Sequence, residues 1–187
     1  MFGKKMIDPW QKCITLNGFH ADEIISALQK SIRRGKEEDA AKFAYELYAT
    51  SPELEAKCWQ RLMTISVEDI GMANPMASVI INSLAQMRLN FDYLDVDRSL
   101  YMIHAIRVLC ESEKDRSSDI LKNICLEENA QGIVPQIPDY ALDKHTKRGQ
   151  EMGRGLNHFY EEASKVYPQA KIDNDYAEKL RKILESK

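Results

Sequence analysis

Two adjacent carboxylates, Glu68 and Asp69, form the first candidate site for chemistry. Such a pair can act as a general acid and base, or supply part of a metal site. The pair also precedes Gly71 in an expected last helical turn, where negative charge opposes the helix dipole and needs a partner. We favour a structural ion pair over an interface or a catalytic role, because ion-pair networks are commoner than catalytic dyads. The candidate partners are Lys57, Arg61, Arg107 and the turn at Ala73 and Asn74.

A basic, glycine-containing segment between Asp143 and His158 is the second candidate site. It carries four cations against two carboxylates, although the whole chain has a net charge of −3. Its glycines, Gly149, Gly153 and Gly155, lower helix stability and suit places where a backbone or a ligand comes close. The segment is a packed tail, a site for an anion or nucleic acid, or a surface for a partner protein. Its candidate contact residues are His145, Lys147, Arg148, Arg154 and His158.

A metal site is the weakest hypothesis for this segment. If residues 150–164 form one helix, one face of that helix carries Glu151, Arg154, His158 and Glu162. His158 and Glu162 are four residues apart, a spacing that suits a metal pair, but two ligands are thin evidence for a site. We therefore expect neither a metal nor a cofactor.

A cationic cluster made of Lys30, Arg33, Arg34 and Lys36 ends the first expected helix. Cations at a helix C-terminus are favoured by the dipole, so the cluster needs no functional explanation. Contact with a phosphate or with DNA is the alternative, because backbone contacts require only well-placed cations.

The remaining reactive or aromatic side chains are expected to be structural. His104 interrupts an apolar stripe and is expected in the core, and Trp10 and Trp59 are expected to pack rather than to stack on bases. The four cysteines form no CxxC pair, so we expect reduced and mostly buried thiols. They are Cys13, Cys58, Cys110 and Cys125.

Enzyme motifs of fixed spacing are absent from the sequence. There is no GxxxxGK[ST] loop for nucleotide phosphates, no HExxH zinc motif and no GxSxG nucleophile turn. The three glycines of the basic segment do not follow a strand, so they do not predict a dinucleotide site. The sequence therefore predicts a protein that is not an enzyme.

Hydrophobic periodicity predicts helices, because apolar residues recur three and four positions apart and no sustained alternation indicates a strand. Caps are expected at Asp22, at Ser51 before Pro52, and at Asn74 before Pro75. The helix from Asp22 to Gly35 is expected to carry Ile24, Ile25, Leu28 and Ile32 on one face. Further helices are expected over 37–49, from Ser51-Pro52 to Gly71, after Asn74-Pro75, after a turn at 90–95, over 117–126 and over 173–186. The helix after Asn74-Pro75 is expected to bury Met76, Val79, Ile80, Leu84 and Met87. The helix after the turn at 90–95 is expected to bury Leu100, Ile103, Ile106 and Leu109. The expectation is an all-α bundle of antiparallel helices.

Composition suggests three parts and an ordinary globular protein. We expect an irregular segment over 1–21, a helical domain over 22–128, and a connector with a C-terminal helical extension over 129–187. Hydrophobic residues make up 44% and charged residues 29% of the chain, which excludes wholesale disorder. No apolar run is long enough to span a membrane, and the N-terminus does not look like a secretory signal. A cytoplasmic protein is expected.

Three stretches of the chain share recurring phrases with a known family: DEIISALQKSIRRGKEEDAAKFAYELY (22–48), RLMTISVEDIGMANPMA (61–77) and HAIRVLCESEKDRSSD (104–119). Together they resemble the C-terminal helical region of the replication-associated recombination protein A family, RarA or MgsA. The second stretch contains Glu68, Asp69, Gly71, Asn74 and Pro75. The AAA+ ATPase module that precedes this region in the family, with its Walker motifs, is missing here.

The resemblance implies a helical bundle like the collar of clamp loaders, which assembles tetramers and accompanies DNA replication, recombination or repair. We therefore expect a non-catalytic oligomerisation and interaction module that forms a homo-oligomer. DNA, a replication or repair protein, or a separate AAA+ ATPase chain are expected partners. The alternative is a protein that binds nucleic acid or phosphate through residues 144–158.

Overall fold

The computed structural model describes residues 9–186, which divide into two compact units, one ending at Gly132 and the other starting at Ile133. Part of the expected N-terminal irregular segment, residues 1–8, lies outside the described residues. Between residues 9 and 186 the regular structure is helical, apart from one isolated β-bridge between Ile14 and His20, so the all-α prediction is confirmed.

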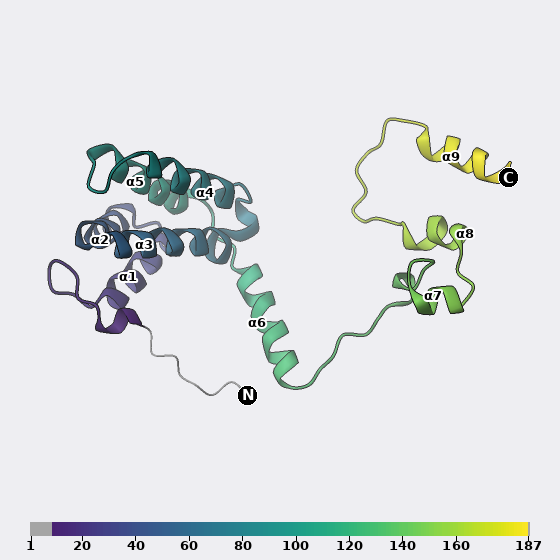
Figure 1. The fold of residues 1–187 in the computed structure, drawn as a ribbon, viewed down its shortest axis with the longest axis horizontal. Coiled ribbons are helices and arrows are strands. Elements are labelled where there is room, and N and C mark those ends of the chain that lie inside the picture. Colours follow the sequence, from purple (N-terminus) through teal and green to yellow (C-terminus); the bar gives the residue numbers. More distant parts are fainter. Residues whose placement is uncertain (1–8, 187) are drawn as a thin grey trace. The chain divides into compact units, whose positions relative to one another are not determined.

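Unit 1 contains six α-helices with short 3-10 and π turns, and the first five α-helices form a bundle (Figure 1). Its α-helices are α1 (Ala21–Arg33), α2 (Glu37–Thr50), α3 (Pro52–Ile65), α4 (Ala77–Met87), α5 (Val96–Glu111) and α6 (Ser117–Ala130). The shorter elements are η1 (Pro9–Lys12), η2 (Ser66–Ile70), η3 (Gly71–Ala73) and η4 (Arg88–Asn90), of which η2 is a π-helix.

The expected apolar stripe of the first helix is confirmed, because the residues predicted to face inward on α1 are all buried. They are Ile24, Ile25, Leu28 and Ile32. The cap of α3 is also confirmed: the Ser51 hydroxyl accepts a hydrogen bond from the Leu54 amide, and Pro52 occupies the first helical position. Trp59 and Leu62 of α3 lie in the same core.

The expected stripe of α4 is wrong at Met76, Val79 and Met87, which are exposed, whereas Leu84 packs against the core as expected. The fully buried residues of α4 are Ala77, Ile81 and Ala85, spaced four apart. On α5, Ile106 and Leu109 are buried as expected, whereas Leu100 is exposed.

Three other local predictions are also corrected. Asp22 does not cap α1, whose N-cap is His20 without a side-chain hydrogen bond. Asn74-Pro75 forms a turn before α4 rather than its cap, because α4 begins at Ala77 and its N-cap is Met76. His104 is exposed on α5 instead of lying in the core.

Helix α6 leaves the bundle and contacts it only around its first turns, at η2 and η3 (Figure 1). No residue of α6 is buried, although the helix is 14 residues long. The rest of unit 1 therefore leaves the apolar side chains of α6 uncovered.

Unit 2 contains short helices and long connections. They are η5 (Asp139–Ala141), α7 (Lys147–Glu151), α8 (Leu156–His158), η6 (Phe159–Ala163) and α9 (Tyr176–Glu185). A turn separates α7 from α8, and Gly153 in this turn has a φ of +71°. The hypothetical helix over 150–164 is therefore absent, and its expected shared face does not exist. Across residues 9–186, no helix combines the length and the apolar character needed to cross a membrane.

Candidate functional sites

The carboxylates of Glu68 and Asp69 lie on η2 and are held by side chains of α1. The Arg33 guanidinium donates to both, with Nε 2.5 Å from Asp69 Oδ1 and a terminal nitrogen 2.7 Å from Glu68 Oε1. The Gln29 amide donates to the same two carboxylates at 3.1 and 2.9 Å. The Asp69 side chain is 0% exposed, so these contacts compensate a fully buried charge.

Arg116, just before α6, is the second cation of this cluster. Its Nε lies 3.3 Å from Asp69 Oδ1, and its terminal nitrogen lies 3.5 Å from Glu68 Oε1 and 2.6 Å from Asp119 Oδ2. We call Gln29, Arg33, Glu68, Asp69 and Arg116 the carboxylate cluster. It joins α1, η2 and the start of α6.

The expected cationic partners of these carboxylates are wrong. Arg61 reaches the cluster only through Gln29, whose side-chain oxygen accepts from it at 3.3 Å. Arg107 pairs with Glu37 instead, at 2.9 Å. Lys57 lies over the ring of Trp10, 5.7 Å from its centroid.

Backbone contacts at Gly71 fix α6 against the carboxylate cluster. The Asp115 amide donates to the Asp69 carbonyl at 3.0 Å. Gly71 has a φ of +52°, and a Cβ added there would lie 2.5 Å from the Asp115 carbonyl oxygen. The position thus requires glycine for both its backbone conformation and the space it leaves. Nearby, the Asn74 amide donates to the Ser112 hydroxyl at 3.0 Å, while Pro75 lies in the turn before α4.

The arrangement leaves the two carboxylates little capacity for acid–base chemistry. Two guanidinium groups and one amide already occupy Glu68 and Asp69, so the geometry suits an anchor between helices. In the part of the chain that the structure describes, no three His, Cys, Asp or Glu side chains gather as a metal site would require.

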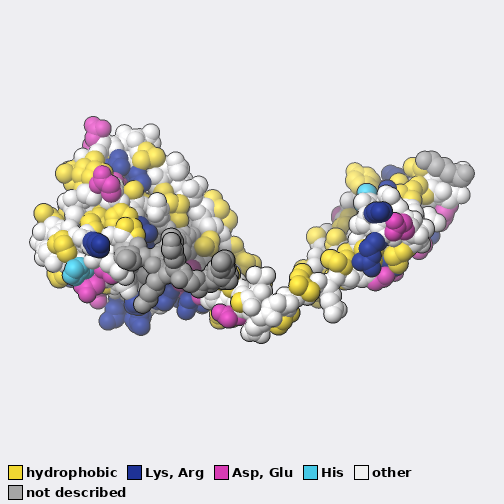
Figure 2. Space-filling model, turned by 60° about the horizontal axis from the view of Figure 1, so that its bottom comes forward, with side chains coloured by type: hydrophobic (Ala, Val, Ile, Leu, Met, Phe, Trp, Pro, Cys, Tyr) yellow, Lys and Arg dark blue, Asp and Glu magenta, His cyan; other side chains and the backbone are white. Residues whose placement is uncertain are grey.

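The cations at the end of α1 divide into two groups. Arg33 belongs to the carboxylate cluster, whereas Lys30 and Arg34 make only local contacts: Lys30 Nζ with the Ser26 hydroxyl, and Arg34 with the Lys30 carbonyl at 2.8 Å. Figure 2 shows Lys and Arg side chains along the lower edge of unit 1, interspersed with acidic and apolar groups.

A tight loop organises the basic segment of unit 2. The Asp143 carboxylate accepts hydrogen bonds from the His145 amide at 3.0 Å and pairs with His145 Nδ1 at 2.8 Å. The hydrogen bond from the His145 side chain is the main cause that lowers the pKa of Asp143 below its ordinary value. The Thr146 hydroxyl caps α7 by accepting from the Gly149 amide. A Cβ on Gly149 would lie 2.0 Å from the Asp143 carbonyl oxygen.

Arg154 closes this loop from the other side. Its guanidinium donates to the carbonyls of Asp139 and Leu142, both at 2.7 Å, and pairs with the Asp139 carboxylate at 2.6 Å. Its contacts are therefore internal. Lys147 and Arg148 point away, and within the described residues Lys147 has a distant carboxylate partner, Glu151 at 3.8 Å, and Arg148 has none.

His158 does not join the other residues of the basic segment in one site. Its Nδ1 atom is buried and lacks a hydrogen-bond partner among residues 9–186. It lies close enough to Glu162 to lower the pKa of that carboxyl, although Lys165 is the larger cause. The five candidate residues thus divide into two that hold the loop, His145 and Arg154, two outward cations, Lys147 and Arg148, and His158, which stands apart.

The cysteine thiols are free, and two of them are poor nucleophiles. Burial raises the pKa of Cys58 to about 12 and that of Cys110 to about 11, so both stay protonated near neutral pH. Cys13 is half-buried and Cys125 is exposed on α6. The expectation of mostly buried thiols is therefore wrong for Cys125.

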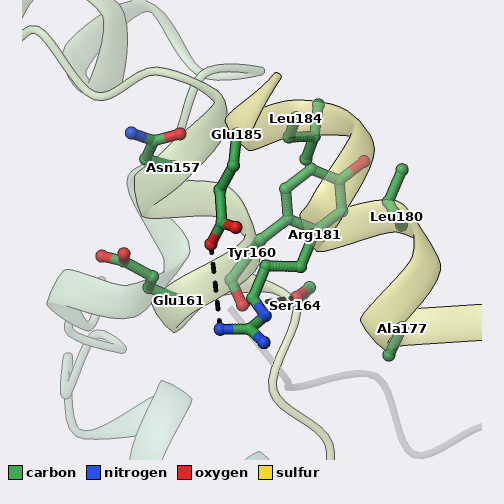
Figure 3. A pocket seen from close by; sticks show the side chains of 9 residues that line it. All are labelled: Asn157, Tyr160, Glu161, Ser164, Ala177, Leu180, Arg181, Leu184 and Glu185. Atoms are coloured by element: carbon green, nitrogen blue, oxygen red, sulfur yellow. Dashed lines mark hydrogen bonds and ion pairs between the residues drawn. The ribbon is translucent and has the colours of Figure 1, made fainter. Parts of the chain in front are cut away.

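One hollow in unit 2 was not indicated by any sequence motif. It has a volume of about 600 Å³ and lies between η6 and α9, where Tyr160 and Leu184 line it (Figure 3). The charged side chains Arg181 and Glu185 face each other across 3.8 Å at its edge. The amphipathic pattern of α9 is the signal that could have located this hollow.

Comparison with known proteins places this geometry in a family context. A family model described as "MgsA AAA+ ATPase C terminal" matches residues 35–183. The chain is also similar to the replication-associated recombination protein A of Bacillus subtilis (strain 168), with 29% identity over 159 residues. This match covers 80% of the present chain and 36% of the relative, so the chain spans about a third of that relative's length.

Proposed function

The chain belongs to the MgsA AAA+ ATPase C-terminal family, as its motifs indicate, and from this premise we propose that it is a non-catalytic module that self-associates. Its place of action is the cytoplasm, in DNA replication, recombination or repair. The name of the Bacillus subtilis relative, a replication-associated recombination protein, supports that assignment. A separate AAA+ ATPase chain and a replication or repair protein are the proposed partners.

The exposed apolar surface of α6 carries this proposal. Ile120, Leu121, Ile124 and Leu126 are all exposed on a helix that contacts the bundle only near its start. An isolated helix of this length is marginal in water, and most helical stability in proteins comes from packing of an apolar face. A covering partner would supply that packing, and a second copy is the simplest cover.

The chemistry of the buried side chains supports a role without catalysis. The carboxylates of Glu68 and Asp69 are held by Arg33 and Arg116, and the Cys58 thiol stays protonated. No Walker motif is present in the chain to bind a nucleotide. Each of these groups has a structural role that accounts for its contacts.

We expect light scattering at tens of micromolar protein to give a tetramer, four times the 21.5 kDa of one chain. That concentration populates an interface with a micromolar Kd. A collar-like assembly of this size would cover the apolar side chains of α6. A mass equal to one chain at every concentration tested would contradict the proposal.

Binding of nucleic acid or phosphate through residues 144–158 is a second candidate function, favoured by the outward position of two cations. Lys147 is 89% exposed, and Arg148 is free of ion pairs within residues 9–186. Lys30 and Arg34 in unit 1 are further cations without a carboxylate partner in that range. Such side chains can contact backbone phosphates without disturbing the fold.

If this second function holds, the double variant Lys147→Ala, Arg148→Ala should weaken DNA binding about uniformly across sequences. The slope of log K against log salt should fall by about one for each phosphate that the variant no longer neutralises. A gel shift over a salt series measures both. Arg154→Ala is not suitable here because its guanidinium holds the loop. The control is Lys179→Ala together with Lys182→Ala on α9, and equal binding by both double variants would dismiss the function.

A further inference from the structure

The exposed face of α6 has the residue spacing of a helix that pairs with another helix. Ser117, Leu121, Ile124, Glu128 and Gln131 are separated by four, three, four and three residues, which places them on one stripe. Ile120 and Cys125 flank this stripe and are also exposed. Leu126 lies on the opposite side of the helix.

The charges of α6 are asymmetric along its length. Its last turns contain Glu127 and Glu128 and no cation, so they oppose the helix dipole. Neither carboxylate has an ion-pair partner among the residues that the structure describes. The other end of α6 offers the positive pole of the dipole. Its one carboxylate, Asp119, is already neutralised by Arg116 at 2.6 Å and Lys122 at 2.8 Å.

We propose that α6 pairs antiparallel with α6 of a second copy, across a two-fold axis near Lys122 and Asn123. The proposal rests on the self-association argued above and names its surface. In this register, Leu121 of one copy packs against Ile124 of the other, and Glu128 meets the N-terminal end at Ser117.

The antiparallel direction follows from the charges. A parallel pair would bring Glu127 and Glu128 beside their own copies, and like charges across an interface are unfavourable. An antiparallel pair instead sets these carboxylates beside the positive end of the second helix. The unfavourable position of Glu127 and Glu128 at the C-terminal end of their own helix is then offset by the positive N-terminal end of the second α6.

The size of the pair sets its strength. A helix of 14 residues is about 21 Å long, so one pair buries less than a standard interface of about 800 Å² per partner. We therefore expect a micromolar Kd for the isolated pair. A tetramer with dihedral symmetry would contain two such pairs and a second type of contact.

Ile124→Glu and Leu126→Glu form a matched pair of variants on opposite sides of α6. The two side chains are 48% and 51% exposed, so neither substitution disturbs the core. Ile124→Glu should reduce the mass in light scattering to half or less at tens of micromolar, and Leu126→Glu should leave it unchanged. Circular dichroism checks that both variants keep their helix content.

Spin labels test the direction of pairing. Cysteines replace Asn123 or Asn129, one at a time, in a background with Cys13→Ser and Cys125→Ser, and pulsed electron paramagnetic resonance measures the label-to-label distance. In the antiparallel register, labels at 123 are offset along the axis by about 1.5 Å and labels at 129 by about 20 Å. The distance should therefore be clearly longer at 129.

Each outcome decides between the two proposals. Equal distances at the two labels, or an Ile124→Glu variant of full mass, would overturn the α6 pairing while the proposed self-association stands. A wild-type chain that stays monomeric would overturn both. The loss of mass in Ile124→Glu alone, together with the longer distance at 129, would support the antiparallel pair.

Discussion

Replacing Asp69 with alanine should lower the free energy of unfolding of unit 1 by about 2–4 kcal/mol. The Asp69 carboxylate is fully buried and contacts Arg33 at 2.5 Å, Gln29 at 2.9 Å and Arg116 at 3.3 Å. The variant leaves two guanidinium groups competing for Glu68. Because both are partly exposed, water compensates some of the loss, and we expect a value near the lower end of the range known for broken buried pairs.

Glu37→Ala is the matched control for Asp69→Ala. Glu37 also pairs with an arginine, Arg107 at 2.9 Å, but both side chains are more than a third exposed. Exposed pairs contribute little, so the control should change stability by less than about 1 kcal/mol. Urea unfolding followed by circular dichroism measures both variants. Equal losses would mean that the carboxylate cluster does not anchor the helices.

The parts of the fold that could be predicted are those that depend on residue spacing within one helix or on hydrogen bonds at its end. The stripe of α1, the cap at Ser51 and the absence of strands follow from spacing and local hydrogen bonding. The face of α4 was not predictable in this way. Its buried row at Ala77, Ile81 and Ala85 depends on how α4 packs among α3, α5 and η2, which periodicity does not encode.

For the candidate sites, too, the local features could be predicted from the sequence, whereas the partners brought together by tertiary packing could not. Glu68 and Asp69 could be recognised as carboxylates that need a cation, because their position before Gly71 opposes the helix dipole. Their actual partners, Arg33 and Arg116, are 35 or more residues away along the chain. Only the packing of α1 and the start of α6 against η2 brings them together.

The basic segment illustrates why residue type alone overstates a binding site. Its cations and histidines were grouped by sequence proximity, yet Arg154 and His145 contact backbone carbonyls and Asp143 within the same loop. The loop thus uses part of its charge to hold its own shape. Lys147 and Arg148 are the cations that stay available for a ligand.

Gly149→Ala should destabilise this loop by about 3 kcal/mol or more. Alanine is favoured over glycine inside a helix by about 1 kcal/mol, so helix propensity alone predicts stabilisation. The added Cβ, however, would lie 2.0 Å from the carbonyl oxygen of Asp143, and 2.6 Å from the carbon and nitrogen of the same residue. Backbone atoms cannot rotate away as a flexible side chain can, so the steric clash outweighs propensity.

Gly155→Ala separates the clash from the general effect of removing a glycine. Gly155 lies six residues further along, and a Cβ there meets no atom within 4 Å. Its φ of −99° is accessible to alanine, so the variant should change stability by less than about 1 kcal/mol. Amide hydrogen exchange at Thr146 to Met152 reports on the loop directly, and residues of unit 1 provide an internal reference.

The same pair of variants tests whether the loop presents its outward cations as a unit. If Gly149→Ala opens the loop, the hydrogen bonds of His145 with Asp143 and of Arg154 with Leu142 should break together, because each depends on the course of the chain at Asp143. Protection at the loop amides should then fall by about two orders of magnitude, the equivalent of 3 kcal/mol. Undiminished protection in Gly149→Ala would mean that the chain at Asp143 can move aside, and that a rigid loop is not what positions Lys147 and Arg148.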